Sequence, residues 1–476
     1  MSTQSETKSA VRVRFAPSPT GHLHIGSLRT ALFNWLFARH HGGTFLIRIE
    51  DTDVQRSMKE YEDSLMQSLS WCGIISDAPI MHQHARLDIY QAVAAQLMSQ
   101  GKAYKCLCTE DELQKKRERT VARQDTYQYD RTCRDLVVSA EHENKPYVVR
   151  FKVETDSADF IFPDHIKGEV SIPSEQIDDF VLLRSDGTVT YNFAVVVDDH
   201  EMAITHIIRG EEHLFNTPKQ ILLYQALGHK VPEFAHIPLI LGPSGQKLSK
   251  RDGATSVVEY KNEGFLPSAL CNYLVRLGWA HGDQEIFTQQ EMIDYFSLDK
   301  IHRSGAKFDI EKLKWINSCY VKKMSVAEIT ELFSVAMGKD IVAATPDWSE
   351  VQRSAWIALY QDRVSTLKEL YDYVLTAYFL PVSYDWDSLR KLIAKDVLII
   401  LQLLQQELIH QEFEKNKLNE KIKAFCKSHD YKMSDIAQLL RFVMIGSLSG
   451  PSVFDMMALL GAQEMHKRIS VLISEV

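Results

Sequence analysis

The sequence predicts an α/β protein whose first half holds a parallel sheet interrupted by a mixed α+β insertion, and whose second half is all α-helical. In residues 11–53 a short strand, a loop rich in proline and glycine, a helix and a second strand follow one another, which is the pattern of a βαβ unit. Residues 147–185 instead show short alternating runs with a Ser-Asp-Gly hairpin signal at 185–187. From residue 265 onward, apolar residues recur at helical spacing.

The βαβ unit is predicted to consist of strand 11–15, a helix that begins after His24, and strand 44–49. The helix repeats apolar residues at the 3.6-residue period of a buried face, and Gly42 ends it. Strand 44–49 leads into the acidic corner 50–53. Because ligands of parallel sheets bind beyond the carboxyl ends of the strands, the loop after the first strand and this corner are predicted to share one site.

Further helices and strands are predicted up to residue 245. Thr109 followed by acidic residues indicates a helix start. The basic run 115–119 inside that helix is typical of a solvated face. The predicted helices are 57–71, 86–99, 109–119 and 216–227, and the predicted strands are 104–107, 193–197, 204–208 and 238–241.

The second half is predicted to be a series of helices with linkers near residues 322–326 and 380. Three prolines, at positions 346, 381 and 451, punctuate it, and proline is rarely tolerated inside a helix. The predicted helices are 266–277, 325–337, 356–372, 389–406, 416–426 and 433–445.

The composition is that of an ordinary globular protein of 476 residues, with 45% hydrophobic and 25% charged residues. A net charge of -9 argues against general binding of polyanions, although local basic patches can still contact a nucleic acid. No apolar run approaches the roughly 18–20 residues of a membrane span, and the first ten residues have no apolar signal core. We therefore expect a cytoplasmic protein without a membrane partner.

Two motifs suggest chemistry with phosphates. His24-Ile25-Gly26-Ser27 opens a helix, whose N–H groups and partial positive charge favour anions. Gly26 allows close approach of a nucleotide, and His24 can donate hydrogen bonds to phosphate oxygens. The distant loop 247–251, Lys-Leu-Ser-Lys-Arg, offers cations for a departing polyphosphate. A histidine cap or a charged loop alone is commonly structural, so the prediction depends on both motifs lying on one sheet.

These motifs resemble the two signature regions of class I aminoacyl-tRNA synthetases, specifically those of the bacterial-type glutamyl-tRNA synthetase family. The resemblance is carried by PSPTGHLHIGSLRTALFNW, LIRIEDTD, TYNFAVVVDDHEMAITHIIRGEEHLFNTPKQ and KLSKRDG. It continues through QDRVSTLKEL and GSLSGPSVFDMMALLGAQEMHKRI, which are similar to the family's helical anticodon-binding region. It thus covers nearly the whole chain after the first ten residues.

The resemblance implies that L-glutamate is ligated to tRNA(Glu) in two steps. The α-carboxylate attacks the α-phosphorus of ATP, which gives glutamyl-adenylate and pyrophosphate, and the terminal ribose of the tRNA then takes the glutamyl group and releases AMP. The substrate is the nucleophile, so catalysis needs positioning and charge stabilisation, with Mg²⁺ accompanying ATP. The implied catalytic residues are His24, Lys247 and Lys250, and the implied ATP-binding residues are His24, Gly26, Ser27, Lys247, Ser249 and Lys250.

A glutamate pocket needs arginine, because a guanidinium binds a carboxylate through paired N–H groups. Arg14 and Arg209 end predicted strands, and Glu50 could hold the ammonium group. Val195 stands where some family members carry a polar residue, which leaves more of the recognition to the arginines. By resemblance, the glutamate site consists of Arg14, Ala16, Ser18, Glu50, Tyr191 and Arg209. In the alternative, purely structural interpretation, the two arginines pair with Asp51, Asp53 or Glu211.

Three of the seven cysteines form a separate pattern, Cys106-Leu-Cys108 followed by Cys133. This pattern resembles the zinc site that some bacterial members carry in the acceptor-binding insertion, and three thiolates suit a tetrahedral Zn²⁺. The family's fourth ligand is often a histidine two residues after the third cysteine. Asp135 stands there in this sequence, and a carboxylate can also bind zinc, with His142 as a substitute. The alternative is three free cysteines without metal.

The resemblance also implies a monomer and a division into four parts. Basic segments at 115–123 and 300–323 would contact phosphates of the tRNA acceptor arm. The parts are a split Rossmann-like catalytic domain at 1–105 and 190–245, an acceptor-binding insertion at 106–189, a stem-contact domain with the Lys-Leu-Ser-Lys-Arg loop at 246–324, and a helical anticodon-binding region at 325–476.

Other functions fit the sequence less well. A glutaminyl-tRNA synthetase would carry a β-barrel anticodon half, and the short tRNA-modifying relatives would lack that half. A small-molecule nucleotidyltransferase would not need the helical tail, and a catalytically inactive RNA-binding relative would be expected to lose His24, Lys250 or Arg209. The sequence leaves open whether tRNA(Gln) is also charged with glutamate; Arg363 and Arg441 are candidates for that discrimination.

Overall fold

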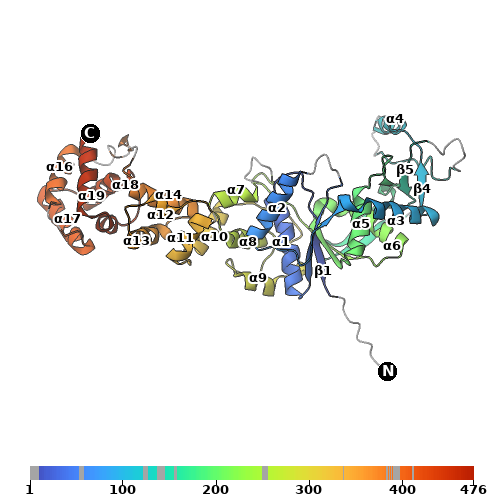
Figure 1. Cartoon of the computed structure of the whole chain (residues 1–476), viewed down its shortest axis with the longest axis horizontal. Coiled ribbons are helices and arrows are strands. Elements are labelled where there is room, and N and C mark those ends of the chain that lie inside the picture. Colours follow the sequence, from blue (N-terminus) through green and yellow to red (C-terminus); the bar gives the residue numbers. More distant parts are fainter. Residues whose placement is uncertain are drawn as a thin grey trace, which may run out of the picture. The chain divides into compact units, whose positions relative to one another are not determined.

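The structure, a computed structural model, describes residues 10–52, 58–121, 127–136, 145–154, 158–248, 256–335, 337–381, 384, 386–387, 389, 397–409 and 412–475 (Figure 1). The chain forms two compact units, one of residues 1–259 and 270–310 and one of residues 260–269 and 311–476. The predicted stem-contact segment 246–324 therefore contributes to both units, and the finer division into four parts stays a prediction. None of the described helices is long and apolar enough to cross a membrane.

The first unit is built on parallel strands from two distant parts of the chain. Strand β1 (Arg12–Phe15) pairs with β2 (Thr44–Ile49), which pairs with the short β3 (Met81–His82). Strand β9 (His206–Gly210) pairs with β10 (Glu233–Ile237) and lies beside β1, where the Thr205 amide donates to the carbonyl of Arg12 at 2.9 Å. The two halves are thus brought together as predicted, with the carboxyl ends of β1, β2 and β9 on one side.

Helix α1 (Ile25–His40) covers these strands with eleven buried residues. It ends at His40, just before Gly42, as predicted, and the φ of +59° at Gly42 belongs to the left-handed region that glycine favours. Gly43 is needed for a different reason, since a Cβ there would lie 2.4 Å from the carbonyl oxygen of Val11. The other helices that begin in this unit or at its boundaries are α2 (Lys59–Trp71), α3 (Leu87–Ser99), α4 (Glu110–Val121), α6 (Thr217–Leu227), α7 (Val257–Asn262), α8 (Pro267–Arg276) and α9 (Gln289–Tyr295).

Two of the predicted strands are wrong. Residues 193–197 lie inside helix α5 (Tyr191–Glu201), where all five side chains are buried. A short apolar run that is buried on every side shows no helical period, and its valines favour a strand, so the pattern misleads. The predicted strand 238–241 is replaced by β10 and the two-residue β11 (Ile240–Leu241), which pairs with β12 (Ala306–Lys307).

The insertion between β3 and α5 is mixed α+β, as predicted. Strands β4 (Ala103–Cys106), β5 (Val148–Phe151) and β8 (Val181–Leu183) form an antiparallel sheet. Strands β6 (Phe160–Asp164) and β7 (Gly168–Ile172) form a separate hairpin, hereafter the β6–β7 hairpin. This hairpin lies against β10, because the His165 amide donates to the carbonyl of Phe234 at 2.9 Å.

The second unit is helical, as predicted, but one of its predicted helices is wrong. Residues 356–372 belong to two helices, since Thr366 caps the second by accepting a hydrogen bond from the Glu369 amide at 3.2 Å. The helices from residue 310 onward are α10 (Ile310–Val321), α11 (Val326–Val335), α12 (Ile341–Ala344), α13 (Glu350–Gln361), α14 (Leu367–Tyr378), α16 (Val397–Glu407), α17 (Lys415–His429), α18 (Met433–Ile445) and α19 (Val453–Glu475).

Candidate active site

Two neighbouring cavities open at the carboxyl ends of β1 and β9, where a parallel sheet places its ligands. One has a volume of about 380 Å³ and the other about 110 Å³. Ser27, Thr30, Gly210 and Glu212 line both cavities, so the two form a continuous site. A larger cavity of about 610 Å³ lies at the opposite, amino end of β10 and is lined mainly by apolar side chains.

His24 begins helix α1 and lines the smaller cavity. Its Nδ1 accepts hydrogen bonds from the amides of Gly26 at 3.1 Å and Ser27 at 3.3 Å. These two N–H groups, which were predicted to be free for phosphate, therefore already have a partner. An imidazole that accepts at Nδ1 can carry its proton only on Nε2, and burial together with Lys247 lowers the pKa of His24. The neutral ring thus carries its donor on Nε2, which lies 3.0 Å from the Ser27 hydroxyl at the edge of the cavity.

The other predicted nucleotide residues surround the same cavity where the structure describes them. Lys247 lines it from a bridge to Leu241, and Gly26 and Ser27 line it from α1. A Cβ on Gly26 would meet the His24 ring at 3.1 Å, so glycine here also protects the cap. Ser249 and Lys250 lie outside the described residues.

The larger of the two cavities brings together every residue predicted to bind glutamate. The residues come from β1, the loop after it, the end of β2, the start of α5 and β9. The predicted residues that line this cavity are Arg14, Ala16, Ser18, Glu50, Tyr191 and Arg209.

One wall of this cavity belongs to a buried cluster of paired arginines and carboxylates that the sequence analysis missed. Arg14 Nε lies 3.0 Å from a carboxylate oxygen of Asp199, and Arg48 also pairs with Asp199. Arg48 reaches Glu50 at 3.1 Å and Asp198 at 3.8 Å. Burial disfavours the charge on Asp199, but the two arginines outweigh it and hold its pKa below the usual value.

Arg209 differs from these arginines because its partners within hydrogen-bonding distance are all neutral. Its Nε donates to His236 at 3.1 Å, Nη1 donates to Gln220 at 2.8 Å, and Nη2 donates to Thr217 at 2.8 Å and more weakly to the carbonyl of His213. The side chain is only 4% exposed. No acidic residue in the described part of the chain lies within ion-pair distance of it, so the predicted pairing with Glu211 does not occur. A buried cation without a counter-ion is costly and suits an anionic ligand.

The proposed acidic partners of the arginines are engaged elsewhere. Asp51 pairs with His84 at 2.5 Å, and Glu211 pairs with Lys167 at 2.5 Å. Asp53 lies outside the described residues. Arg14 therefore has a structural partner, Asp199, other than the predicted ones, and neither arginine pairs with Asp51 or Glu211.

Two aromatic side chains complete the environment of Arg209. The Tyr191 hydroxyl lies 3.2 Å from Nδ1 of His213, and the two rings stack. Burial, with Glu50 nearby, raises the pKa of Tyr191 to about 12, so its hydroxyl remains a hydrogen-bond donor at neutral pH. Burial and the charge of Arg209 lower the pKa of His213 to about 4, so this ring is neutral.

The sequence pattern around three of the residues missed by the sequence analysis could have identified them. Arg48 interrupts an apolar strand, and Asp198 and Asp199 interrupt the apolar run of α5. Charges inside apolar runs are rarely tolerated unless they are paired, so the sequence indicates that these three residues pair with one another. No comparable local pattern pointed to Thr217, Gln220 or His236.

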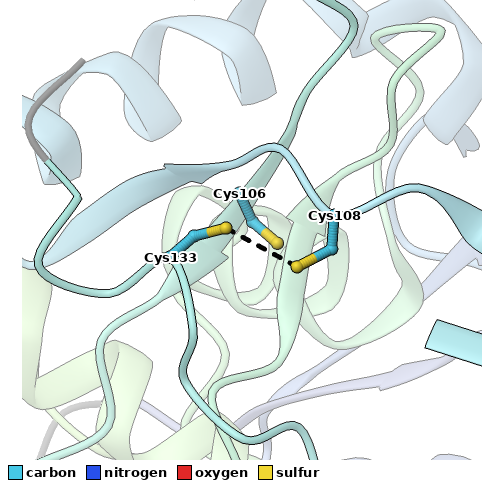
Figure 2. A group of neighbouring side chains, drawn as sticks. All are labelled: Cys106, Cys108 and Cys133. Carbon is cyan, nitrogen blue, oxygen red and sulfur yellow. Dashed lines mark hydrogen bonds between the residues drawn. The ribbon is translucent and has the colours of Figure 1, made fainter. Parts of the chain in front are cut away.

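The three cysteines of the insertion also come together. Their sulfurs lie within 4.8 Å of one another, and Figure 2 shows them turned toward a common centre, with Cys108 and Cys133 3.6 Å apart. The hydroxyl of Tyr129 lies 3.2 Å from the Cys106 sulfur and 3.7 Å from the Cys108 sulfur. Three buried or half-buried thiols and a phenol therefore surround one point, which fits the donors and the tetrahedral number that Zn²⁺ prefers.

Asp135 does not join this group. Its side chain is 87% exposed, and a carboxylate oxygen lies 3.7 Å from Lys152 Nζ instead. It lies at the end of the turn formed by residues 132–135. The expectation that Asp135 is the fourth ligand is therefore not met in this structure, and His142 lies outside the described residues.

In the second unit, the two arginines considered for tRNA discrimination have different surroundings. The Arg441 guanidinium donates to the carbonyls of Leu448 at 3.0 Å and Pro451 at 3.2 Å, which close the turn after α18. Arg363 lines a cavity of about 270 Å³ together with Tyr360 and Tyr373. Arg441 thus has a structural role that leaves Arg363 as the better candidate.

Two family models together match residues 10–473 of the chain. Residues 10–315 match the family described as tRNA synthetases class I (E and Q), catalytic domain, and residues 316–473 match the anticodon binding domain family. The chain is 44% identical over 466 residues to the glutamate–tRNA ligase of Thermodesulfovibrio yellowstonii, covering 96% of this chain and 98% of that protein. It is 43% identical to the glutamate–tRNA ligase of Syntrophotalea carbinolica, covering 97% and 98%.

Solved structures give the same result. The glutamate tRNA ligase from Elizabethkingia meningosepticum, in complex with its amino acid, superposes with a TM-score of 0.86 at 35% identity, covering 98% of this chain and 99% of that chain. The glutamate-tRNA synthetase from Elizabethkingia anophelis has a TM-score of 0.84 at 36% identity, covering 98% and 100%.

Proposed function

Since the chain belongs to the class I tRNA synthetases of the glutamate and glutamine group, we propose that it ligates L-glutamate to tRNA(Glu) with ATP. In the first step the α-carboxylate of glutamate attacks the α-phosphorus of ATP, the bond to the β-phosphate oxygen breaks, and pyrophosphate leaves. In the second step a hydroxyl of the terminal ribose attacks the glutamyl carbonyl, and AMP leaves. Mg²⁺ would accompany ATP and partly neutralise its phosphates.

The observation that carries this proposal is the neutral environment of Arg209. The fold buries this guanidinium beside a cavity and surrounds it with neutral acceptors. The side-chain carboxylate of glutamate would supply the missing negative charge through paired N–H···O bonds. Glutamine would supply only a neutral amide, one end of which is itself a donor, so the site favours the acid over the amide.

The remaining residues of the larger cavity suit the other end of the amino acid. Glu50 offers a carboxylate to the ammonium group, and Arg14 retains N–H groups beyond those directed at Asp199. Ser18 and Tyr191 supply hydroxyl hydrogen bonds, and Ala16 leaves room for the substrate backbone. This assignment orients the α-carboxylate toward the smaller cavity.

The smaller cavity would hold the phosphates of ATP. His24 donates from Nε2, and Lys247 adds a positive charge, so both oppose the negative charge that develops as pyrophosphate leaves. Gly26 and Ser27 shape the wall, and Ser249 and Lys250 complete the group by sequence. Because the nucleophile belongs to the substrate, the protein's contribution is positioning and electrostatic stabilisation.

The test is ATP–pyrophosphate exchange with the Arg209→Ala variant, measured with glutamate in the presence and absence of tRNA. We expect exchange to fall by at least about a hundredfold, because an ion pair with a buried partner is lost, while ATP binding is retained. Arg39→Ala is the matched control, since Arg39 is a half-exposed arginine on α1 that pairs with Asp77. Exchange at the wild-type rate by Arg209→Ala would overturn the assignment.

The choice of tRNA is a separate part of the proposal. We expect tRNA(Glu) to be charged by a monomeric, cytoplasmic enzyme, with Arg363 facing the tRNA in the second unit. Aminoacylation of purified tRNA(Glu) and tRNA(Gln) with glutamate would show whether the enzyme is discriminating, and Arg363→Gln should change the ratio of the two rates. Light scattering at micromolar concentration would reveal a dimer if one forms.

The thiol group of the insertion would hold Zn²⁺ in a structural role. Cys106, Cys108 and Cys133 would be the thiolate ligands, and the Tyr129 hydroxyl or a solvent molecule would take the fourth position. Metal analysis of purified protein should show about one zinc per chain, and Cys133→Ala should lose it. Asp135→Ala should retain the metal, since Asp135 points away. Wild-type protein that is active and free of zinc would contradict this proposal.

A further inference from the structure

Arg209, which we assign to the substrate carboxylate, is held from behind by a chain of two buried side chains. Arg209 and His236 are register partners on the parallel strands β9 and β10, and Arg209 Nε donates to His236 Nε2 at 3.1 Å. His236 is fully buried, and its Nδ1 lies 2.6 Å from a carboxylate oxygen of Asp164. Asp164 ends β6, 72 residues earlier in the chain.

This geometry determines where the proton of His236 lies. A guanidinium can only donate, so His236 Nε2 must be the acceptor and carries no hydrogen. The ring therefore carries its proton on Nδ1, where it donates to Asp164. The ring is neutral, as burial and the neighbouring Arg209 charge together lower the pKa of His236 even though Asp164 opposes this.

Asp164 is itself held in one orientation by backbone amides. One of its carboxylate oxygens accepts from the amides of Ile166 at 2.9 Å and Lys167 at 2.8 Å. The other accepts from the His236 amide at 3.1 Å and from the His236 ring. These donors hold the pKa of Asp164 below its usual value despite burial, so the carboxylate is charged.

We propose that Asp164 and His236 are positioning residues that hold Arg209 in the orientation required for glutamate recognition. The proposal rests on the proposed function of Arg209. Of the five N–H groups of a guanidinium, the three short hydrogen bonds to His236, Gln220 and Thr217 use one on each nitrogen. The second N–H on Nη1 then remains for a carboxylate oxygen, and Nη2 has besides Thr217 only the long 3.4 Å contact with the His213 carbonyl, which a carboxylate could replace.

The hydrogen-bonded chain Asp164–His236–Arg209, hereafter the relay, makes the β6–β7 hairpin a part of the amino-acid site. The hairpin belongs to the insertion, and its hydrogen-bonded path to Arg209 passes through His236. A neutral acceptor behind Arg209 leaves the full positive charge for the substrate, whereas a carboxylate in direct contact would neutralise it. His236 therefore holds the guanidinium of Arg209 in its orientation and keeps the negative charge of Asp164 out of direct contact with it.

Asp164→Asn is the sharpest test, because it keeps the shape and replaces one acceptor oxygen, which faces the ring and the backbone amide of His236, by an NH₂ donor. The amide oxygen must face the Ile166 and Lys167 amides, so the NH₂ group must face His236 Nδ1. His236 then has to carry its proton on Nε2, directly opposite the Nε–H of Arg209. We expect KM for glutamate to rise about tenfold or more, with KM for ATP unchanged and kcat changed less than KM.

Substitutions of His236 provide an independent comparison. His236→Phe preserves the ring size and removes the acceptor, so KM for glutamate should rise as in Asp164→Asn. His236→Gln can still offer a carbonyl oxygen to Arg209 and should show a smaller rise. His165→Ala is the matched control: His165 follows Asp164 in the same hairpin but is half-exposed and pairs with Glu233 at 2.6 Å, so its KM should equal that of the wild type.

A structural role alone would give different results. If the variants merely destabilise the fold, the active fraction and kcat fall while KM for glutamate stays at the wild-type value, and the proposal is overturned. Nitrogen-15 spectra of histidine-labelled wild-type protein, with the His236 signal identified by its absence in His236→Phe, should show the Nδ1–H form. An Nε2–H or doubly protonated ring in the wild type would also overturn it, whether or not the variants fold.

The outcome for Arg209 itself separates the two proposals. If Arg209→Ala activates glutamate normally, the proposed function of this site fails and the relay fails with it. If Arg209→Ala loses glutamate while Asp164→Asn and His236→Phe keep the wild-type KM, the relay alone is wrong.

Discussion

Buried arginines on two walls of the same cavity have opposite kinds of partner. On one wall Arg14 and Arg48 share Asp199, and Arg48 also reaches Glu50 and Asp198. On the other wall Arg209 meets a hydroxyl, an amide oxygen and a neutral imidazole. All three arginines are nearly inaccessible to solvent, so burial does not distinguish them.

This difference distinguishes buried charges that are paired within the fold from a buried charge that lacks a counter-ion. The first wall is compensated within the fold, so loss of one charge leaves its partners buried and unpaired. The second wall is uncompensated until a ligand arrives, so loss of its charge costs binding far more than folding. Three measurements can test this contrast.

The largest effect on folding should come from Asp199→Asn. This change leaves Arg14 and Arg48 without their shared carboxylate, and removal of one partner from a buried pair costs about 3–5 kcal/mol in the free energy of unfolding. Urea denaturation measures this loss. Glu201→Gln serves as the control, because Glu201 is half-exposed and pairs with Arg86, so little stability should be lost. A loss below about 1 kcal/mol for Asp199→Asn would mean that the cluster does not act as a compensated unit.

The second effect is a dependence of stability on pH that originates beside Arg209. The folded pKa of His213 is lowered from 6.5 to about 4, so the unfolded state binds more protons between these values. Stability from His213 is therefore fully present above pH 6.5 and is lost as the pH falls toward 4, by at most about 1.4 kcal/mol per pH unit. Asp199, with its lowered pKa, weakens the other wall only at still lower pH. Urea denaturation between pH 7 and pH 4 should show this slope, and His213→Gln should flatten it; equal slopes would refute the assignment.

The smallest effect on folding should come from Arg209→Met. The substitution removes an unpaired buried charge, which is favourable, but leaves three neutral acceptors without a donor, which is not. We expect the free energy of unfolding to change by less than about 2 kcal/mol. Glutamate should raise the Tm of the wild type and should no longer raise that of the variant. A destabilisation as large as that of Asp199→Asn would remove the distinction between the two walls.

Much of this site could be predicted from the sequence, because its residues lie at the ends of elements whose pattern is local. Arg14 lies near the end of the first strand, Glu50 directly follows the second, and His24 caps the helix between them. The cavity lined by all six predicted glutamate residues confirms that they lie together, while their binding roles stay predictions. Tyr191 lines this cavity as predicted, although residues 193–197, predicted as a strand, belong to helix α5, which begins at Tyr191.

The parts that could not be predicted depend on contacts between distant residues. His236 lies in a strand whose position was predicted five residues too late, and Asp164 lies in a hairpin that showed no chemical motif. Asp135 was chosen by spacing after Cys133, but spacing does not give the direction of a side chain. Tyr129, four residues before Cys133, approaches the thiols because the chain turns there, and an isolated tyrosine gives no signal in the sequence.

The cap of helix α1 has a consequence for the order in which this site is assembled. The two amides that begin the helix are bonded to His24 Nδ1, so the folding of the first helical turn already selects which nitrogen carries the proton. The proton is therefore on Nε2 before any substrate enters, 3.0 Å from the Ser27 hydroxyl, and a ligand that uses this donor has to compete with that hydroxyl. A substitution that removes the cap would change both the start of the helix and the nitrogen that carries the proton.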